Sequence, residues 1–385
     1  MHIYALGANM KTAIIKFVKK ETVLTIATIL AIISAFFVHP GKQYTEYIDW
    51  RTLGILLSLM IIMEGFKRTG LFDALAQRLL KHTGRLWQLV LVLVFLCFFL
   101  SMLITNDVAL LTFVPFSVMV LEGCNRRDAL IPTIVLQTVA ANLGSMMTPI
   151  GNPQNLYLYS LIGCNVAEFM RILLPYTLVT ALLLLVSVLF IRNKKDDIRY
   201  VEKTEAGREN GTSILVKNSM YGILFAVALL VVAKVIAYYW LVAAVVIAVA
   251  LIDRRTLITV DYALIFTFIS FFVLIGNLGN IEQIRMWLSK LVETREVFVG
   301  VIASQFISNV PATLLLSGFT DDYSSLLIGV NLGGLGTFIA SMASLISYKI
   351  YAHNYNDTKG RYLLTFTWVN LAYLAVLLAE YMLLR

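Results

Sequence analysis

The sequence predicts an all-α integral membrane protein in two inverted repeats, with about nine transmembrane helices, two re-entrant hairpins and interrupted helices. Three observations predict this class. Of the 385 residues, 59% are hydrophobic and 14% are charged, and the mean hydropathy is +0.82, so most of the chain is suited to lipid. One polar cluster occurs twice. Basic residues flank the apolar runs in the alternating pattern of a multi-pass protein.

Six apolar runs have lengths suited to membrane helices or parts of them, at residues 22–38, 53–65, 87–104, 172–191, 221–232 and 362–384. The first run follows Lys11, Lys16, Lys19 and Lys20, as the apolar region of a signal peptide would. No small-residue cleavage site comes after it, so we expect a first helix that is retained.

The repeated cluster is Ser-Met-Leu-Ile-Thr-Asn-Asp at 101–107 and Ser-Gln-Phe-Ile-Ser-Asn-Val at 304–310. A second match follows each copy, from Asn142 to Thr148 and from Asn331 to Thr337. Two matches in the same order indicate a duplicated unit. In a membrane protein, duplicated units that carry helix-interrupting polar residues are typical of transporters whose site lies where the repeats meet.

Charge placement predicts the topology. The basic segments place the amino terminus in the cytoplasm, and an odd number of crossings between the repeats then places the carboxyl terminus outside, in a multi-pass protein of the plasma (inner) membrane. Segments 87–121 and 297–317 must each return to the side from which they entered, as paired full spans or as re-entrant hairpins. Residues 108–121 are short for a span, and a polar turn is costly in lipid. We therefore expect hairpins with buried tips.

The same reasoning divides the chain into five parts. These are an amino-terminal segment with the first transmembrane helix (1–47), a first repeat with hairpin 1 (48–191), a cytoplasmic linker (192–217), connecting helices (218–259) and a second repeat with hairpin 2 (260–385). Residues 71–81 and 281–292 are predicted to form short amphipathic helices at matching positions, lying along opposite membrane faces as arms that carry the hairpins.

The polar clusters are predicted to begin helices. Thr105 with Asn106, Ser308 with Asn309, and Asn152 have the residue types of helix N-caps, and we expect Pro153 and Pro311 at first helical positions. Free amides at such helix starts favour an anion, while side-chain oxygens and the carbonyls of interrupted turns can hold Na⁺. The alternative is that these residues only cap buried loops.

Asp107 is the one carboxylate that the sequence places deep in the bilayer. An aspartate at a helix centre costs about 2.5–3.5 kcal/mol on insertion scales, so it needs a partner or a proton. No lysine or arginine lies near it in the sequence. We expect Asp107 to be a coupling-ion or proton site; the alternative is that it caps the helix that follows.

Other classes of protein lack their signatures. The three cysteines and four histidines show no disulfide or metal-ligand spacing, and we expect no cofactor and no resident metal. We expect no enzyme, because no intramembrane protease or nucleophile motif is present. The net charge of +8 fits loop orientation rather than nucleic-acid binding. A channel stays open as an alternative. The chain has no ATP-binding motif, and a separate ATPase subunit is not indicated.

Longer motifs carry a family resemblance. Asn106-Asp107-Val-Ala-Leu-Leu-Thr-Phe-Val-Pro and Ser308-Asn309-Val-Pro-Ala-Thr313 resemble the paired signature of bacterial arsenite permeases, and residues 140–155 are similar to a second element of the same ion transporter superfamily. That superfamily also holds NhaD-type antiporters, citrate transporters and divalent-anion:sodium symporters. The resemblance covers the chain from about residue 49 onward.

The resemblance implies two substrate or ion sites, a homodimer, and an elevator-type motion of a transport domain against a scaffold. The first tip would share a site with the interrupted helix after it, at Thr105, Asn106, Asp107, Thr148, Gly151 and Asn152. The second would combine Ser308, Asn309, Thr337 and Ser341. Further motif and repeat residues complete the expected set: Asn142, Gly144, Asn155, Thr313 and Asn331. Transient Na⁺ is expected at Asn106, Asp107 and Gly151, and at Ser308 and Asn309.

Two transport functions remain open. In the first, a small anion or oxyacid, such as an arsenite-like solute, moves with H⁺ or Na⁺. In the second, the protein is a Na⁺/H⁺ antiporter. The symporters of the superfamily carry Ser-Asn-Thr at both tips, whereas this chain has Asp107 and Val310 in the third positions. An ionised Asp107 would repel a dicarboxylate, which argues against a dicarboxylate or citrate:Na⁺ symporter.

Overall fold

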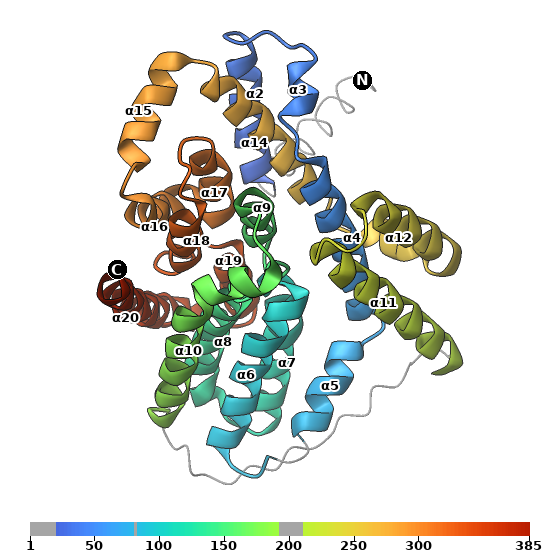
Figure 1. The fold of residues 1–385 in the computed structure, drawn as a ribbon. Coiled ribbons are helices and arrows are strands. Elements are labelled where there is room, and N and C mark those ends of the chain that lie inside the picture. Colours follow the sequence, from blue (N-terminus) through green and yellow to red (C-terminus); the bar gives the residue numbers. More distant parts are fainter. Residues whose placement is uncertain (1–20, 81–82, 192–210) are drawn as a thin grey trace, which may run out of the picture.

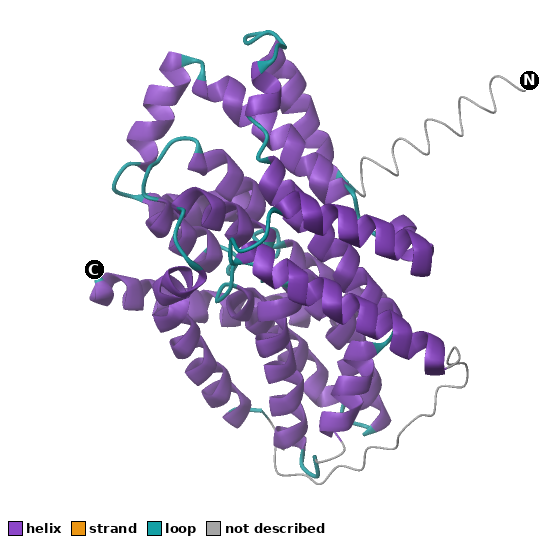
Figure 2. Cartoon of the chain, turned by 45° about the vertical axis from the view of Figure 1, so that its right-hand side comes forward, coloured by secondary structure: helices purple, strands orange, loops and turns teal. Residues whose placement is uncertain are grey.

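The computed structural model describes residues 21–80, 83–191 and 211–385, and within these ranges every regular element is a helix (Figures 1 and 2). The predicted all-α class is confirmed for this part of the chain. Five described helices are long and apolar enough to cross a membrane, and a sixth span results if α14 and α15, which meet at a bend of 104°, are counted as one. The crossing number and the re-entry of the hairpins stay predictions.

The first half runs from the amino-terminal helices to a long helix that ends before the linker. Its elements are α2 (Thr22–Ala35), α3 (Gln43–Glu46), α4 (Trp50–Arg68), α5 (Leu71–Leu80), α6 (Leu86–Ile104), α7 (Asn106–Gly123), η1 (Arg127–Ala129), α8 (Leu130–Ser145), α9 (Pro153–Ile162) and α10 (Val166–Leu189).

The second half repeats this order of elements from α14 onward. Its elements are α11 (Gly211–Val232), α12 (Tyr238–Ile252), α13 (Arg254–Thr259), α14 (Ala263–Gly279), α15 (Glu282–Val292), α16 (Glu296–Ile307), α17 (Asn309–Ser317), α18 (Tyr323–Leu332), α19 (Met342–Asn354), η2 (Asn356–Thr358) and α20 (Lys359–Leu384). Helices α5 and α15 are the predicted short arms.

Two boundaries differ from the sequence prediction. Helix α11 begins at Gly211, so the last seven residues assigned to the linker are helical. Ile214, Leu215 and Val216 explain this, since they extend the apolar run toward the linker. Residues 192–210 and the four amino-terminal lysines lie outside the described residues. Helix α7 has 18 residues rather than the 14 of the predicted run 108–121, because Asn106, Asp107, Glu122 and Gly123 join it.

The two halves exchange their leading helices. Helix α2 precedes α4 in the chain but packs on α14, while α12 precedes α14 but packs on α4 (Figure 1). Thr28 and Ser270 share a hydrogen bond of 3.0 Å between α2 and α14, and Asn277 Nδ2 donates to Ser34 Oγ at 2.9 Å. The exchange joins the repeats into one body.

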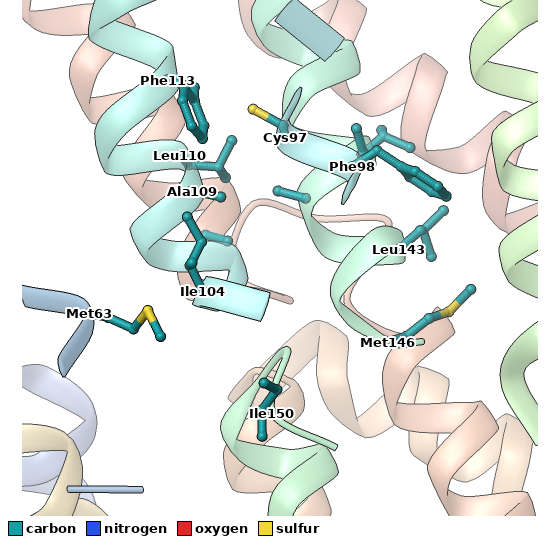
Figure 3. Packing of buried hydrophobic residues seen from close by; sticks show 14 of the residues in the cluster. Met63, Cys97, Phe98, Ile104, Ala109, Leu110, Phe113, Leu143, Met146 and Ile150 are labelled. Atoms are coloured by element: carbon teal, nitrogen blue, oxygen red, sulfur yellow. The ribbon is translucent and has the colours of Figure 1, made fainter. Parts of the chain in front are cut away.

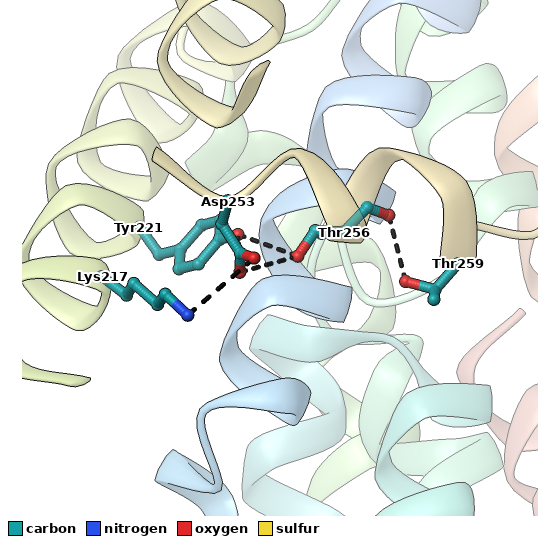
Figure 4. Close-up of polar contacts among 5 residues, drawn as sticks. All are labelled: Lys217, Tyr221, Asp253, Thr256 and Thr259. Carbon is teal, nitrogen blue, oxygen red and sulfur yellow. Dashed lines mark hydrogen bonds and ion pairs between the residues drawn. The ribbon is translucent and has the colours of Figure 1, made fainter. Parts of the chain in front are cut away.

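Helix α11 is held by a buried polar cluster (Figure 4). The Tyr221 hydroxyl and Thr256 Oγ1 donate to Asp253 Oδ2 at 3.1 and 2.9 Å, and Lys217 Nζ lies 4.0 Å from Asp253 Oδ1. The Tyr221 ring fills the space over Gly65 of α4, where a Cβ would come within 2.1 Å of it. Asp253 is thus a buried carboxylate that the sequence did not single out, and its contacts give it a structural role.

A tightly packed apolar region surrounds the end of the α6–α7 hairpin (Figure 3). Ile104 and Ala109 lie at the tip, and Met146 and Ile150 come from the segment between α8 and α9. Met63 of α4 reaches the same region. All five side chains are buried, so the tip is embedded in protein and its neighbouring backbone groups must find partners there.

Candidate functional site

A single residue separates the two helices of each hairpin. Thr105 lies between α6 and α7 with φ 70° and ψ 149°, and Ser308 lies between α16 and α17 with φ 73° and ψ 154°. Positive φ with such ψ is costly for any residue except glycine, on the order of 1–3 kcal/mol, and persists only where the surroundings impose it. Strained backbone of this kind is concentrated at functional sites, and the repeats share it.

Each tip is fixed to the interrupted helix of its own half. The Asn106 N–H donates to the Gly151 carbonyl at 3.2 Å, and the Asn309 N–H donates to the Ala340 carbonyl at 2.9 Å. The side chains of Thr148 and Thr337 add a second tie, because they donate to the carbonyls of Met102 and Gln305. The pairing of hairpin and interrupted helix that the resemblance implied is therefore present in both halves.

The capping prediction was correct for Asn152 and incorrect in detail for the tips. Asn152 Oδ1 accepts from the Asn155 N–H at 2.9 Å, with Pro153 at the first helical position. At the tips, Thr105 and Ser308 make no side-chain cap bond. Instead the first helical residue, Asn106 or Asn309, accepts from the next N–H at 2.9 Å. Pro311 is the third residue of α17, in the first turn, where the backbone N–H has no partner within the helix and proline is therefore tolerated.

Two asparagines cross from one half to the other. Asn142 of α8 accepts from Ser341 Oγ at 2.9 Å and donates to Ser344 Oγ at 3.1 Å, both in the second half. Asn331 of α18 accepts from Asn152 Nδ2 at 3.1 Å and donates to Asn155 Oδ1 at 2.7 Å, both in the first half.

The crossing links the halves through buried side chains. Asn106 Nδ2 donates to Asn142 Oδ1 at 3.2 Å and so joins the first tip to this network. All of these asparagines are at most 5% exposed. The sequence pattern matched Asn142 with Asn331, but it gave no indication that each would bind the opposite half.

Two glycines permit this close packing. A Cβ on Gly144 would lie 2.2 Å from the Phe98 carbonyl oxygen of α6, and one on Gly151 would lie 2.0 Å from the Ser145 carbonyl oxygen. Their role is therefore to allow backbones to approach. Thr313 and Thr337 do not point into the network: Thr313 Oγ1 donates to the Asn309 carbonyl of its own helix, and Thr337 is exposed.

Asp107 lies in the first turn of α7, half-buried, beside Asn106. Among the described residues no ion pair or side-chain hydrogen bond reaches its carboxylate. The charged group that acts on it electrostatically is Asp261, just before α14. Sequence reasoning missed Asp261, because nothing in the chain order brings residue 261 to the first hairpin. At the equivalent place in the second tip stands Val310, so the two otherwise matched tips differ in charge.

A cavity of about 1030 Å³ opens beside α7. It is lined on this helix by Leu111, Pro115 and Met119, and Leu111 lies one turn beyond Asp107. Lys67, Arg68 and Lys217 stand on the opposite walls with Asp73 and Asp253. An anion in this cavity would meet more positive than negative side chains.

Duplicated halves that exchange helices, two strained hairpin tips and two interrupted helices whose starts converge are features of a membrane transporter built from two repeats. The comparison with known proteins agrees. The sequence pattern of the citrate transporter family matches residues 12–323, so the chain belongs to that family. The sequence resemblance to the superfamily of arsenite permeases, NhaD antiporters and citrate transporters is confirmed at this level.

Two relatives that match most of the chain are named as a transporter and as an inner membrane protein, and a third matches a shorter part of it. An uncharacterized transporter of Methanocaldococcus jannaschii is 33% identical over 344 residues, which are 89% of this chain and 92% of that protein. The inner membrane protein YbiR of Escherichia coli is 29% identical over 336 residues, 83% and 84% of the two chains. The human P protein is 29% identical over 116 residues, 30% of this chain and 14% of that protein. Family and names indicate a transporter rather than an enzyme.

Proposed function

We propose that this protein is a secondary active transporter that moves a small anion or oxyacid together with, or in exchange for, H⁺ or Na⁺. The observation that carries the proposal is the crossed network of Asn142 and Asn331, which gathers the starts of helices from both halves around one buried region. Helices α7, α9, α17 and α19 all begin there. A ligand bound in this region would contact both repeats.

The anion follows from these helix starts. The aligned peptide dipoles give each helix start partial positive charge, so several converging starts favour negative charge nearby, although the first two amides of α7 and of α17 are already bonded within the protein. The basic walls of the cavity beside α7 would raise the local concentration of an anion on its way to the tip.

The coupling ion follows from Asp107. A half-buried carboxylate with no described ion pair is stabilised by taking a proton or by sharing a bound cation. The Asn106 amide oxygen and the Gly151 carbonyl oxygen lie at the same tip and are suitable Na⁺ ligands. Because Val310 replaces the carboxylate in the second tip, we expect unequal coupling at the two tips.

The family description names citrate, whereas the sequence argued against a polycarboxylate because of Asp107. The two statements are compatible if Asp107 is neutralised first. A protonated or Na⁺-bound Asp107 does not repel a carboxylate, so loading of the coupling ion would precede binding of the anion. The substrate class thus extends from inorganic oxyacids to carboxylates such as citrate.

The second candidate is a Na⁺/H⁺ antiporter. It is favoured by Asp107 itself, because a half-buried carboxylate with no described ion pair can take up either a proton or Na⁺. In that case Asp107 is the exchange site and no anion moves.

The remaining parts of the proposal come from the resemblance and from charge placement. The resemblance implies a homodimer, and the basic segments place the amino terminus in the cytoplasm and the carboxyl terminus outside the plasma membrane. We expect no resident cofactor, and a separate ATPase subunit is possible but not indicated. An elevator-type motion carries the two hairpins and interrupted helices across the bilayer against α4, α11 and α12.

Flux into proteoliposomes under imposed proton or sodium gradients tests the proposal. We expect uptake of a labelled anion, with citrate and arsenite as first probes, to follow one of the gradients. Cation exchange without anion movement selects the antiporter. Anion flux that ignores both gradients refutes both candidates.

Asp107→Asn should abolish proton coupling while the protein stays folded. Asp128→Asn is the matched control, since Asp128 is a carboxylate beyond the far end of the same hairpin. An unchanged pH dependence of flux in Asp107→Asn would remove Asp107 from the mechanism.

A further inference from the structure

A groove of about 760 Å³ lies between α8, α10, α19 and α20, away from the hairpin tips. Its walls are apolar, with Leu136 from α8, Phe190 and Ile191 directly after α10, and Val369 from α20. Its mouth carries Arg127 and Arg361. We propose that this groove binds one anionic phospholipid, with the phosphate at the two arginines and an acyl chain along the apolar walls.

The length of the groove fits a lipid. Arg361 lies in the first turn of α20 and Tyr373 lies 12 residues further, which is about 18 Å along a helix. At the far end the Tyr373 hydroxyl is already paired with Ser187 Oγ at 2.7 Å. Because the hydroxyls of Tyr373 and Ser187 bond each other, this end of the groove suits a hydrocarbon chain.

The charge at the mouth favours an anionic headgroup. Asp128 is bound by Arg126 through two contacts of 2.9 Å, and Glu122 is bound by Arg127 at 3.0 Å. Arg361 is exposed, and none of the ion pairs among the described residues involves it. The charged residues that line the groove are two arginines, Arg127 and Arg361, and one carboxylate, Asp128, which leaves one positive charge at the mouth. Basic pockets between membrane helices are a known type of site for acidic lipid headgroups.

The repeat provides a contrast. The corresponding place in the other half, next to the α17–α18 connection and the last turn of α20, is a cavity of about 880 Å³. Its lining is polar and acidic, with Glu293, Glu296, Asp321 and Asp322 beside Arg285 and Arg385. An apolar groove with a basic mouth is therefore not a general result of the fold. Of these two related places, only the one between α8, α10, α19 and α20 has it.

Native mass spectrometry of the purified full-length protein tests the proposal. The protein is mixed with equal amounts of phosphatidylglycerol and phosphatidylcholine, and the lipids retained after removal of detergent are counted. We expect one phosphatidylglycerol to be retained in preference to phosphatidylcholine. Arg361→Gln should reduce this preference at least several-fold, because it removes the exposed cation. Ala372→Phe should reduce retention of that lipid, because it fills the groove.

Arg285→Gln is the matched control, since it removes an arginine from the acidic cavity of the other half. It should leave the retained phosphatidylglycerol unchanged. Equal retention of the two lipids, or loss of phosphatidylglycerol in Arg285→Gln but not in Arg361→Gln, overturns the proposal. Loss of a protein dimer in Ala372→Phe without any change in lipid would assign the groove to a second copy instead. The proposal does not depend on the transported solute, so these outcomes are distinct from those of the flux experiments.

Discussion

Replacing Gly144 by alanine should destabilise the protein, although alanine is the better helix former. Gly144 lies in α8, and a Cβ there would be 2.2 Å from the Phe98 carbonyl oxygen and 2.8 Å from Ser101 Oγ. Ordinary contact begins at 3.4 Å, so α6 and α8 must separate by about 1.2 Å (3.4 minus 2.2). The oxygen belongs to the backbone and cannot rotate away. Overpacking of this kind costs about 1–3 kcal/mol.

The gain in helix propensity offsets part of that cost. Alanine in place of glycine within a helix contributes about 0.5–1 kcal/mol. The net loss therefore lies between about 0 and 2.5 kcal/mol, and its midpoint of about 1.3 kcal/mol corresponds to a factor of roughly 10 in the unfolding equilibrium. The measurement is the unfolding transition of the purified protein in mixed micelles, followed by circular dichroism.

The control is Gly222→Ala in α11, where nothing lies within 4 Å of the new Cβ. It should be as stable as the wild type or stabler by up to about 1 kcal/mol. We also expect Gly144→Ala to reduce flux more than Gly222→Ala, because Ser101 is one turn from the Thr105 tip. If Gly144→Ala unfolds at or above the wild-type transition, the close approach of α6 and α8 is not as the structure shows.

Two further predictions concern the network and the surface. Asn331→Ala removes the hydrogen bonds to Asn152 and Asn155 and should lower the free energy of unfolding by about 1–3 kcal/mol, since it leaves buried partners unpaired. The control is Asn354→Ala, at an exposed helix end. If both variants unfold at the same point, the crossed network is contradicted. Arg126 holds the pKa of Asp128 below its ordinary 3.8, mainly through their hydrogen bonds. Because the folded pKa is the lower one, this contribution is present above pH 3.8 and is lost as the pH falls through the folded pKa. The stability difference between wild type and Asp128→Asn should follow that course in acid unfolding curves, and a difference that grows on acidification would contradict it.

Much of the fold could be predicted because it depends on local sequence. Apolar runs predicted α2, α4, α6 and α20 within three residues at each end, whereas α10 and α11 begin six and ten residues before the predicted runs. The repeated cluster predicted where both hairpins turn. The polar residue types at Thr105 and Ser308 predict a turn. They do not predict a positive φ, because neither residue is glycine. That conformation is imposed by the Gly151 and Ala340 carbonyls, which lie more than 30 residues away in the chain.

The parts that could not be predicted depend on contacts between the halves. Asn142 and Asn331 were correctly matched as repeat partners, yet each hydrogen-bonds the opposite repeat. Sequence spacing contains no information about this exchange. For the same reason Asp261 was missed, and Asp253 was not recognised as buried. Thr313 was included because of its motif position, but its hydroxyl serves its own helix.

The distribution of hydrogen bonds favours movement of the site as one body. The two tips, the two interrupted helices and the crossing asparagines are bonded to one another, so separating them would break several buried bonds at once. The contact of Met63 in α4 with the first tip is apolar, and apolar surfaces slide without losing hydrogen bonds.

A few hydrogen bonds connect α9 to α11 and to the turn that follows α11. They lie near the carboxyl-terminal end of α9. Tyr159 donates to the Val232 carbonyl at 3.0 Å, and Lys234 Nζ donates to the Gly163 and Cys164 carbonyls at 2.8 and 2.9 Å. Under the proposed elevator motion these few bonds must break or act as a pivot, while the network around Asn142 stays intact. The alternative, in which the tips open singly, would instead break the bonds of Asn106 to Gly151 and Asn142. Those bonds are buried and belong to the network that Asn142 extends into the second half, so the movement of the whole unit is the less costly of the two.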